Sequence, residues 1–503
     1  MTEITPVSMD LLLGAVDLLA SVLLFGIGVL ILVAMMLYIV DVTQTRHAVR
    51  RNYPVIGRFR YWFEHLGEFF RQYFFAQDRE EMPFNRAQRS WAYRASKNIT
   101  NTLPFGSTRD LTRPGTVLFV NDPYPDLSQK DAQCPPLVIG PDTSEPYSSE
   151  HFFHISAMSY GAISNVAVQA LSRGAARAGC WLNTGEGGLA PYHLEGGCDL
   201  VFQIGTAKYG VRDEHGDLSK ARLRELGENP NIRMFEIKLS QGAKPGFGGI
   251  LPGVKVTAEI ARIRGIPEGR TSISPRRHLE VANPAQLLDM VARVRDLTGK
   301  PVGFKTVVGS ERVLDDWVEE ILKRGPASAP DFITIDGCDG GSGAAPMPLL
   351  DAVGLPLRES LPMVVDRLEQ SGLRERIRII ASGKQVNPSD VAWALCLGAD
   401  FICSARAFMF ALGCIQAMQC NRNTCPTGVT THNPRLQQGL NPTDKAVRVA
   451  HLARNMEAEV AMIAHSCGVP HPRALNRTHA RIVQPNGLSI SLHKLYPMPV
   501  RAA

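Results

Sequence analysis

Residues 399–428 read ADFICSARAFMFALGCIQAMQCNRNTCPTG, and the rest of the chain is organised around this stretch. The apolar run from Asp400 to Cys403 predicts a short buried strand. A helical pattern opens at Ser404-Ala405-Arg406 and ends at Gly413-Cys414. The stretch therefore predicts a strand that leads into a helix, followed by an irregular loop.

Three cysteines stand on the end of this helix and in the loop beyond it. Cys414, Cys420 and Cys425 are separated by five and then four residues, and Pro426 follows the last. A cysteine-rich loop that ends in Cys-Pro is typical of an iron–sulfur cluster held by thiolates. Three thiolates fit a cluster of three irons better than structural zinc, which takes four protein ligands. Three buried free thiols are the alternative, because cysteine is among the most buried residue types.

The strand in this stretch is the last of eight candidates. The others cover residues 152–158, 180–183, 200–204, 234–239, 301–307, 331–335 and 377–381. Helical patterns lie between several of them, at residues 165–178, 284–297, 311–324 and 388–397. Short strands that alternate with helices indicate parallel βαβ units. Eight in succession predict an α/β fold of the (β/α)8 barrel type, with its chemistry at the carboxyl ends of the strands. An open, doubly wound sheet is the alternative.

Unusual residues gather where these strands end. Glycine-rich segments such as 337–343 let backbone amides approach a ligand closely. Lys238 and Lys305 lie on central strands, where positive charge would favour a reduced flavin ring. The last two loops, Ser382-Gly383-Lys384 and Ser404-Ala405-Arg406, stand where barrels commonly bind a phosphate. Each feature alone is also compatible with a turn or a solvated lysine, but together they favour one ligand site.

Composition narrows the class of protein. The chain has 503 residues, a formal net charge of +6 and ten cysteines. Much of the positive charge lies between Arg46 and Arg60, so we expect no nucleic-acid partner. Ten cysteines in so long a chain do not make a disulfide scaffold, and the cysteine loop indicates a reducing compartment.

The N-terminal region predicts a membrane anchor. Leu18 to Val40 contains no charged residue, and at about 1.5 Å per residue it spans a hydrocarbon core of roughly 30 Å. A buried core helix is the alternative. Basic residues follow the segment, so we expect a single-pass membrane protein with its larger part in the cytoplasm. The aromatic segment from Arg60 to Phe75 either lies in the membrane interface or packs on the main domain.

Four parts follow from these patterns. Residues 1–45 are expected to form a transmembrane anchor, and residues 46–150 a juxtamembrane and wrapping arm that is polar and rich in proline. Residues 151–440 form the predicted barrel with its cysteine loop. Residues 441–503 hold one long amphipathic helix, predicted over 444–464, and a tail.

Over residues 151–434 the chain resembles the FMN-binding synthase domain of glutamate synthases. In that family the fold is a (β/α)8 barrel that holds FMN and a 3Fe–4S cluster. The family adds ammonia to 2-oxoglutarate and reduces the 2-iminoglutarate formed to L-glutamate. The motifs that carry the resemblance are AMSYG at 157–161, NTGEGG at 183–188, EIKLSQGAKPG at 236–246, DGCDGGSGA at 336–344 and the cysteine run at 414–426.

The resemblance implies a role for particular residues. Lys244 and Arg264 match positions that hold the carboxylates of the oxoacid, and Glu186 matches a position at the ammonia entry and flavin side. Lys305 matches the lysine beside the flavin ring, and the three cysteines match the cluster ligands. A surface helix position for Arg264 and a strand-end cap for Glu186 are the alternatives. The implied cofactor-binding residues are Ser156, Met158, Ser159, Gln203, Lys238, Gln241, Lys305, Asp336, Gly340, Gly341, Gly383, Lys384, Ser404, Ala405 and Arg406.

The chain departs from the family pattern in the loop at 246–253. Ile250 stands where the family has a glutamine that helps to bind the oxoacid, and Phe247 stands where it has a glutamate. A branched alkyl group cannot donate to a carboxylate, so a more apolar 2-oxoacid is an alternative substrate. Arg276 and Arg277, which are additional to the family pattern, are expected to restore anion binding.

The rest of the sequence bears on partners. A membrane segment stands where full-length glutamate synthases have an amidotransferase domain, so we expect ammonia from solution or from a partner. No G-x-G-x-x-G follows a strand, so NAD(P)H is not expected to bind here. Electrons are then expected from a partner subunit, a ferredoxin or a membrane donor.

Two other functions compete with this interpretation. The first is a barrel flavoenzyme that acts on hydroxy acids or on a different 2-oxo or imino acid. A hydroxy-acid enzyme needs a histidine base near the flavin, and His193, His215 and His278 are the loop candidates. The second is a non-catalytic, membrane-anchored scaffold.

Overall fold

A computed structural model of the protein describes residues 6–125 and 134–499. The chain forms two compact units, Met1–Ala87 and Gln88–Ala503. The boundary lies inside the predicted arm, because the residues after Ala87 pack on the second unit. Trp91 Nε1, for example, donates to Glu459 Oε2 at 2.8 Å.

Eight parallel strands of the second unit close into a barrel in the order β10-β11-β12-β13-β4-β5-β6-β7. All eight predicted strands are present, and the closed barrel excludes the open, doubly wound alternative. The eight barrel strands are β4 (Phe153–Ile155), β5 (Leu182–Asn183), β6 (Leu200–Ile204), β7 (Ile232–Lys238), β10 (Val302–Thr306), β11 (Phe332–Asp336), β12 (Arg378–Ser382) and β13 (Phe401–Ser404).

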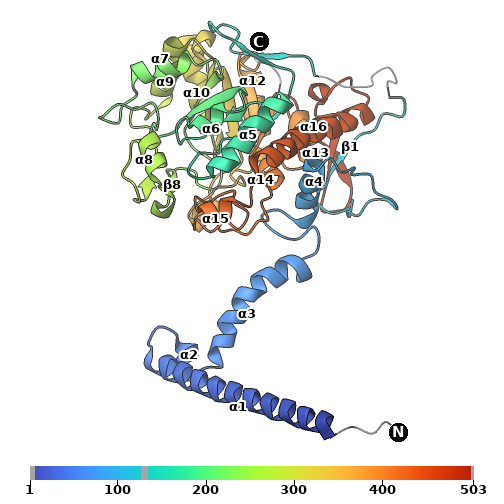
Figure 1. The fold of residues 1–503 in the computed structure, drawn as a ribbon. Coiled ribbons are helices and arrows are strands. Elements are labelled where there is room, and N and C mark those ends of the chain that lie inside the picture. The colour runs from blue at the N-terminus through green and yellow to red at the C-terminus, as the bar shows by residue number, and fades with distance from the viewer. Residues whose placement is uncertain (1–5, 126–133, 500–503) are drawn as a thin grey trace. The chain divides into compact units, whose positions relative to one another are not determined.

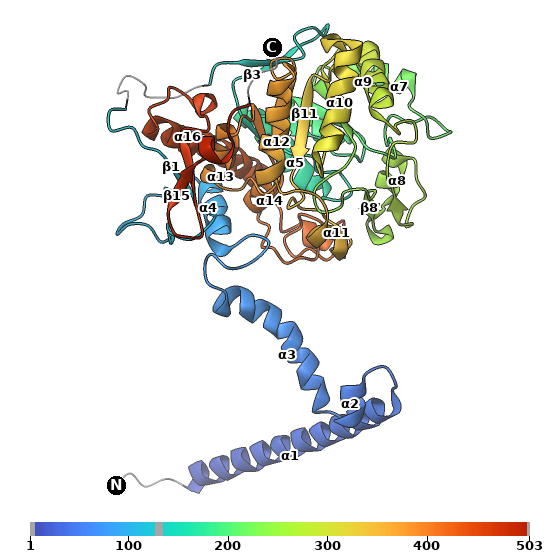
Figure 2. The same cartoon turned by 180° about the vertical axis from the view of Figure 1, so that it is seen from behind.

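The predicted helices surround the barrel as α5 (Asn165–Ala178), α9 (Pro284–Thr298), α10 (Glu311–Arg324) and α13 (Pro388–Cys396). Their ends follow local rules: Ser164 caps α5 by accepting from the Ala167 amide, and Gly179 ends it with φ +73°. Figures 1 and 2 show opposite sides of the barrel, with α5 in front in one and α10 and α12 in the other.

Several helices have no counterpart in the prediction. The longer ones are α4 (Arg86–Ser96), α7 (Lys220–Gly227), α8 (Ala258–Arg264) and α12 (Leu357–Gln370). The shorter ones are α6 (Pro191–Leu194), α11 (Met347–Ala352), α15 (Pro434–Gln437) and α17 (Leu492–Leu495). The helix predicted between Ser404 and Gly413 is present as α14 (Arg406–Leu412). The predicted long C-terminal helix is α16 (Pro442–Ser466), which packs on α5, α13 and α14.

Small antiparallel sheets complete the second unit. The hairpin of β2 (Leu137–Ile139) and β3 (Tyr147–Ser149) packs Ile139 and Tyr147 against Trp181, Phe332 and Phe401. Because these aromatic residues stand at or just before the starts of barrel strands, the hairpin closes the amino-terminal end of the barrel. The other sheets are β1-β14-β15, from Val117–Phe119, Ala480–Val483 and Ser489–Ser491, and β8-β9, from Ile250–Leu251 and Ser272–Ile273.

The first unit contains α1 (Pro6–Thr43), α2 (Ala48–Asn52), α3 (Gly57–Phe70) and one π turn, η1 (Arg71–Phe75). Among the described residues, α1 is the one helix that is long and apolar enough to cross a membrane, judged by length and composition only. Its candidate span is Asp10–Thr43, with a mean hydropathy of 2.9 and none of the tested window buried.

Candidate active site

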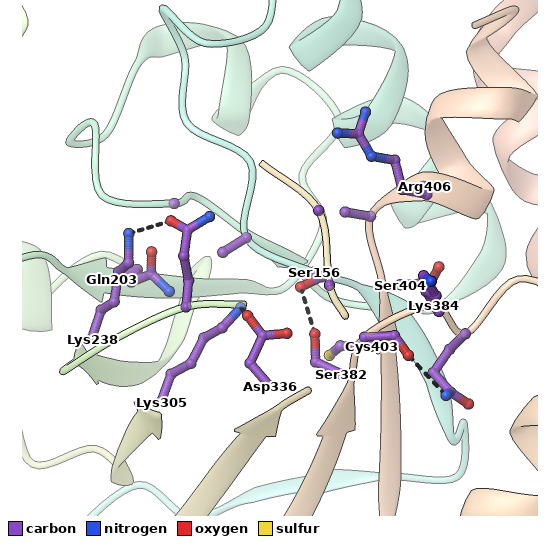
Figure 3. A pocket seen from close by; sticks show the side chains of 18 of the residues that line it. Ser156, Gln203, Lys238, Lys305, Asp336, Ser382, Lys384, Cys403, Ser404 and Arg406 are labelled. Carbon is purple, nitrogen blue, oxygen red and sulfur yellow. Dashed lines mark hydrogen bonds and ion pairs between the residues drawn. The ribbon is translucent and has the colours of Figure 1, made fainter. Parts of the chain in front are cut away.

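The carboxyl ends of the barrel strands surround a first cavity of about 600 Å3 (Figure 3). Every predicted cofactor residue except Met158 lines this cavity, whereas Met158 lines a neighbouring one. The first cavity is lined by Ser156, Ala157, Ser159, Gly185, Glu186, Gln203, Lys238, Gln241, Lys305, Asp336, Gly340, Gly341, Ser382, Gly383, Lys384, Gln385, Cys403, Ser404, Ala405 and Arg406.

Two lysines of the first cavity are each paired with a carboxylate. Lys238 Nζ lies 2.8 Å from Glu186 Oε1 and donates to Gln241 Oε1 at 2.7 Å. Lys305 Nζ lies 3.1 Å from Asp336 Oδ2. The charges of Lys238 and Lys305 are therefore balanced locally, and the ion pairs hold both side chains in place.

The electrostatics keep these pairs charged. Burial opposes ionisation of Glu186, but Lys238 and other nearby cations outweigh it and lower the pKa of the carboxyl. Burial also opposes charge on Lys305, but Asp336 and further acids outweigh it and raise the pKa of the ammonium. The pairing thus offsets the cost of burying each charge.

The other side of the first cavity, to the right in Figure 3, has the features of a flavin phosphate site. Lys384 has a left-handed backbone with φ +48°, a strain that usually accompanies function. A Cβ added at Gly341 would lie 2.8 Å from Arg406 Nε, so the glycine lets the guanidinium lie close to this backbone. The Gln385 Oε1 acceptor is buried and has no hydrogen-bond partner among the described residues. A cationic, glycine-lined end and an open acceptor fit FMN.

A second cavity of about 980 Å3 adjoins the first and shares Glu186 and Arg406 with it. One wall is apolar, with Ile163, Ile250 and Leu251 among its residues. The rest of the lining includes three buried basic side chains, Lys244, Lys255 and Arg264, besides the half-buried Arg406.

Lys244 and Arg264 are buried without a carboxylate in ion-pair contact among the described residues. Lys244 Nζ donates to the Ala344 carbonyl at 3.1 Å, and Arg264 Nη2 donates to the Tyr160 carbonyl at 2.8 Å. Arg264 Nε has no partner in the described part of the chain. Burial lowers the pKa of Lys244 to about 8 and also lowers the pKa of Arg264. Both cations would be stabilised by an anion.

Lys255 is a third buried cation, which the sequence did not indicate. It stands at the end of the short turn η2 (Gly253–Lys255) and is 2% exposed. Its Nζ donates to the Cys420 carbonyl at 3.2 Å and to the Ala162 carbonyl. Burial lowers its pKa to about 8. A lysine that follows a Pro-Gly turn is usually solvated, so no sequence signal distinguished it.

Glu186 lies where the two cavities meet. Glycines make room for its side chain: a Cβ at Gly249 would lie 2.3 Å from Glu186 Oε1, and a Cβ at Gly205 would lie 2.5 Å from Glu186 Cβ. The carboxylate therefore faces both cavities instead of capping a strand.

The three predicted cluster cysteines line one small cavity of about 280 Å3. Cys414 follows α14 and its left-handed cap Gly413, and Cys420 also lines the second cavity. The loop curls through the left-handed residues Gln416, Met418 and Asn423, which is rare for side-chain-bearing residues.

The donor set of this small cavity fits a cluster better than a single ion. No three His, Cys, Asp or Glu side chains in the described residues gather closely enough to hold one metal ion. In a three-iron cluster each thiolate binds a different iron, so the sulfurs need only border a common space. Burial opposes ionisation of Cys425, but hydrogen bonds from Thr427 and Thr430 outweigh it and lower the pKa of the thiol.

Arg276 and Arg277 do not restore anion binding, contrary to the sequence-based expectation. Both are exposed and neither lines the second cavity. Arg277 Nη1 donates to the backbone carbonyls of His278, Leu279 and Val281. The segment turns these arginines away from the site, which the charge pattern alone does not reveal.

The two departures from the family loop have different surroundings. Ile250 lines the second cavity, on strand β8, so the expectation that it borders the substrate agrees with its position. Phe247 is half-buried and lines none of the three cavities. Only Ile250 is placed to affect a ligand directly.

The histidine base expected of a hydroxy-acid enzyme is absent from both large cavities. His193 is buried and hydrogen-bonds the Ala190 backbone, and His278 Nε2 lies 3.0 Å from the Lys238 carbonyl. His215 is exposed. None of these three candidates lines either cavity.

Sequence reasoning missed other lining residues besides Lys255. Gln385 directly follows the predicted Gly383 and Lys384, so its position next to a phosphate-type loop was an available signal. Met409 lies on α14, where it read as an ordinary core residue of an apolar helix.

Comparison with known proteins agrees with this geometry. The family described as "Conserved region in glutamate synthase" matches residues 116–470. A glutamate synthase large subunit-like protein of Bacillus subtilis is 39% identical over 91% of this chain and 94% of the relative. An archaeal-type glutamate synthase [NADPH] of Dehalococcoides mccartyi is 33% identical over 69% of this chain, which spans 66% of that relative.

Solved structures also resemble the chain, at low identity. A mandelate oxidase with (S)-4-hydroxymandelic acid aligns over 78% of this chain and 98% of its own, with a TM-score of 0.46 and 15% identity. An (S)-mandelate dehydrogenase chimera aligns over the same shares with a TM-score of 0.45.

The barrel, its paired cavities and the sequence matches define an FMN-dependent oxidoreductase of glutamate synthase type. The chain belongs to the glutamate synthase family.

Proposed function

We propose that the protein reduces the imine formed from 2-oxoglutarate and ammonia, which yields L-glutamate. One observation carries this proposal: Lys244, Lys255 and Arg264 are buried in the second cavity, and the hydrogen bonds they donate within the described residues go to backbone carbonyls. Buried cations without carboxylate partners are costly unless an anion joins them.

A dicarboxylic oxoacid suits these three cations. Its two carboxylates require at least two cationic groups, and Arg and Lys bind carboxylates through charge-assisted hydrogen bonds. Arg264 retains an unused Nε donor in the described structure, and Lys244 donates to the carbonyl of Ala344, which also lines the cavity. With both ends held, the central keto carbon would be presented near Glu186, where the cavities meet.

Glu186 is placed to manage protons in this reaction. Ammonia adds to the keto carbon of 2-oxoglutarate, and loss of water leaves the imine. Because its pKa is lowered, Glu186 is ionised at neutral pH and can accept the proton that the added nitrogen gives up. FMN in the first cavity would supply the hydride that converts the imine to the amine.

We further propose that Cys414, Cys420 and Cys425 hold a 3Fe–4S cluster that carries electrons toward the flavin. Support comes from the cavity they share and from Cys420, which borders both this cavity and the substrate cavity. The electron source would be a partner subunit, a ferredoxin or a membrane donor, and ammonia would come from solution or a partner. Several relatives carry NADPH in their names, but those proteins are longer than the part this chain matches.

The N-terminal helix is proposed to anchor the protein as a single-pass membrane protein with the barrel in the cytoplasm. Its length and mean hydropathy suit a membrane span, and the basic residues that follow it suit a cytoplasmic flank. The proposed parts remain an anchor at 1–45, an arm at 46–150, the barrel at 151–440 and a C-terminal part at 441–503.

An anaerobic single turnover tests the reaction without any electron donor. The detergent-purified protein should contain flavin and about three irons per chain. After chemical reduction, 2-oxoglutarate and ammonium together should reoxidise the flavin and form L-glutamate, while either alone should not. A colourless protein would support the scaffold alternative, and a flavin that stays reduced with both substrates would overturn the proposed reaction.

The runner-up reaction uses the same chemistry on a more apolar 2-oxoacid. Ile250, Ile163 and Leu251 form the apolar wall of the second cavity, which favours an alkyl side chain. This alternative needs only one carboxylate, which leaves at least one of the three buried cations without an anion.

A further inference from the structure

An aromatic stripe on α3 has no role in the barrel chemistry. Large apolar side chains are exposed at Phe59, Trp62, Phe63, Phe69 and Phe70, with exposed fractions between 40% and 58%. At about 100° per residue, these positions and the half-buried Leu66 fall on one face of the helix. The opposite face carries only polar and small residues and Tyr61, at positions 60, 61, 64, 65, 67 and 68.

The stripe continues past α3. The π turn Arg71–Phe75 adds the exposed residues Tyr73, Phe74 and Phe75, of which the last two are 75% and 73% exposed. Soluble proteins rarely expose an apolar surface of this extent to water, and such patches mark sites of interaction. A two-faced aromatic helix is the usual form of a segment that lies along a membrane surface.

Contacts within the first unit fix where this helix begins. Arg58 donates to Asp41 from Nε and from Nη2, both at 2.8 Å, and the Val55 amide donates to the same carboxylate at 3.0 Å. Asp41 is 1% exposed and lies two residues before the end of the candidate span. The guanidinium carbon of Arg50 also lies 4.6 Å from the Tyr61 ring centroid. The aromatic stripe therefore starts at the end of the apolar helix α1.

The charge of the junction matches phospholipid headgroups. Between Val42 and Phe63 the sequence has five arginines, at 46, 50, 51, 58 and 60, and no Asp or Glu. Basic residues next to a membrane helix are attracted to anionic lipid phosphates. Tyrosine and tryptophan favour the same headgroup level, because their rings are both apolar and polar.

We propose that α3 and the following π turn lie in the interfacial layer of a phospholipid bilayer, with the aromatic face toward the acyl chains. The arginines of the junction other than Arg58, which binds Asp41, face lipid phosphates, and Glu64 and Glu68 face water. This inference goes beyond the proposed reaction and does not depend on it. The occupant of the stripe is lipid, not the barrel unit and not a second copy of the chain.

Quenching of Trp62 by brominated lipid tests the proposal on the full chain. The chain has five tryptophans, and Trp62 is the one in the first unit. The protein is reconstituted into vesicles of phosphatidylcholine and phosphatidylglycerol, with or without bromine on the acyl chains. We expect bromine to quench the wild-type protein clearly more than W62F, which lacks the reporting indole.

A matched variant separates the two faces of the helix. In W62F/E64W the new indole stands two residues on, about 200° around the helix on the polar face, and we expect bromine to quench it no more than W62F alone. Equal quenching of the wild type and W62F would show that Trp62 does not touch lipid and would overturn the proposal. Equal quenching at positions 62 and 64 would overturn the assigned orientation of the helix.

Discussion

The two large cavities at the barrel mouth treat buried positive charge in opposite ways. In the first cavity Lys238 and Lys305 each face a carboxylate, at 2.8 and 3.1 Å. In the second, Lys244 and Arg264 donate to backbone carbonyls and have no ion-paired carboxylate among the described residues, although both are at least as buried. A carbonyl satisfies a hydrogen bond but cancels no charge.

In the first cavity the protein neutralises the buried lysines with its own carboxylates. In the second cavity the buried cations are left for an anionic ligand to neutralise. Paired lysines keep their position and charge whether or not a cofactor is bound, which suits a permanently held flavin. Unpaired cations raise the energy of the empty site and lower the energy of the site that holds an anion. The second cavity is therefore suited to an anionic substrate that enters and leaves.

The largest expected effect is on the free energy of unfolding when one lysine is removed from each cavity. K305M leaves Asp336 buried without its cation, and removing one partner of such a pair costs about 3–5 kcal/mol. K244M removes a buried charge that has no carboxylate partner, so its free energy of unfolding should not fall. Thermal unfolding of flavin-depleted protein in detergent measures both. Equal losses in the two variants would contradict the contrast.

The next largest effect is expected on the oxoacid. R264Q should lower kcat/KM for 2-oxoglutarate roughly 100-fold, which corresponds to about 3 kcal/mol of lost transition-state stabilisation, because a buried carboxylate loses its guanidinium partner. R262Q is the matched control, since Arg262 lies on the same helix and is exposed. If kcat/KM fell as far in R262Q as in R264Q, the loss would not depend on the position of Arg264 in the cavity, and the proposed contact with the oxoacid would be wrong.

The pH dependence of binding sharpens the role of Lys244. Its pKa is lowered to about 8 by burial, so the free protein carries the charged ammonium below pH 8 and loses it above. Affinity for 2-oxoglutarate, measured without ammonium, should be full below pH 8 and fall about tenfold per pH unit above it. In K244R the guanidinium stays charged, and this contribution to the fall should disappear. An unchanged profile in K244R would assign the titration to another group.

The smallest effect concerns the two departures from the family loop. I250Q places an amide hydrogen-bond donor in the second cavity and should lower KM for 2-oxoglutarate roughly fivefold, which corresponds to about 1 kcal/mol of binding free energy. F247E changes a residue that lines neither large cavity and should leave KM unchanged. Steady-state kinetics distinguishes them, and a larger effect in F247E would contradict their assigned positions.

Much of the barrel could be predicted from local sequence. All eight strands appear because buried parallel strands are short apolar runs, and α5 and α10 match their predicted bounds because caps and periodicity agree. Helix α12 was missed because Pro356 precedes it and Pro362 lies inside it. The mixed, polar composition of α7 gave little periodic signal.

The site was predictable where a residue sits on a strand end and less so elsewhere. Strand-end residues such as Lys305 must face the barrel mouth, so their place follows from topology. Lys255 and Arg277 lie on turns, where sequence does not specify the direction of a side chain. Lys255 turns into the cavity and Arg277 turns to backbone carbonyls.

The central claim is that the unpaired cations of the second cavity bind a dicarboxylate. A direct competition between two oxoacids tests it. Reduced protein with saturating ammonium is offered 2-oxoglutarate and 4-methyl-2-oxopentanoate, and the amino acids formed are quantified. The dicarboxylate should be preferred by about tenfold or more, because it engages a second buried cation. Equal use of the two acids, or preference for the branched one, would contradict the account.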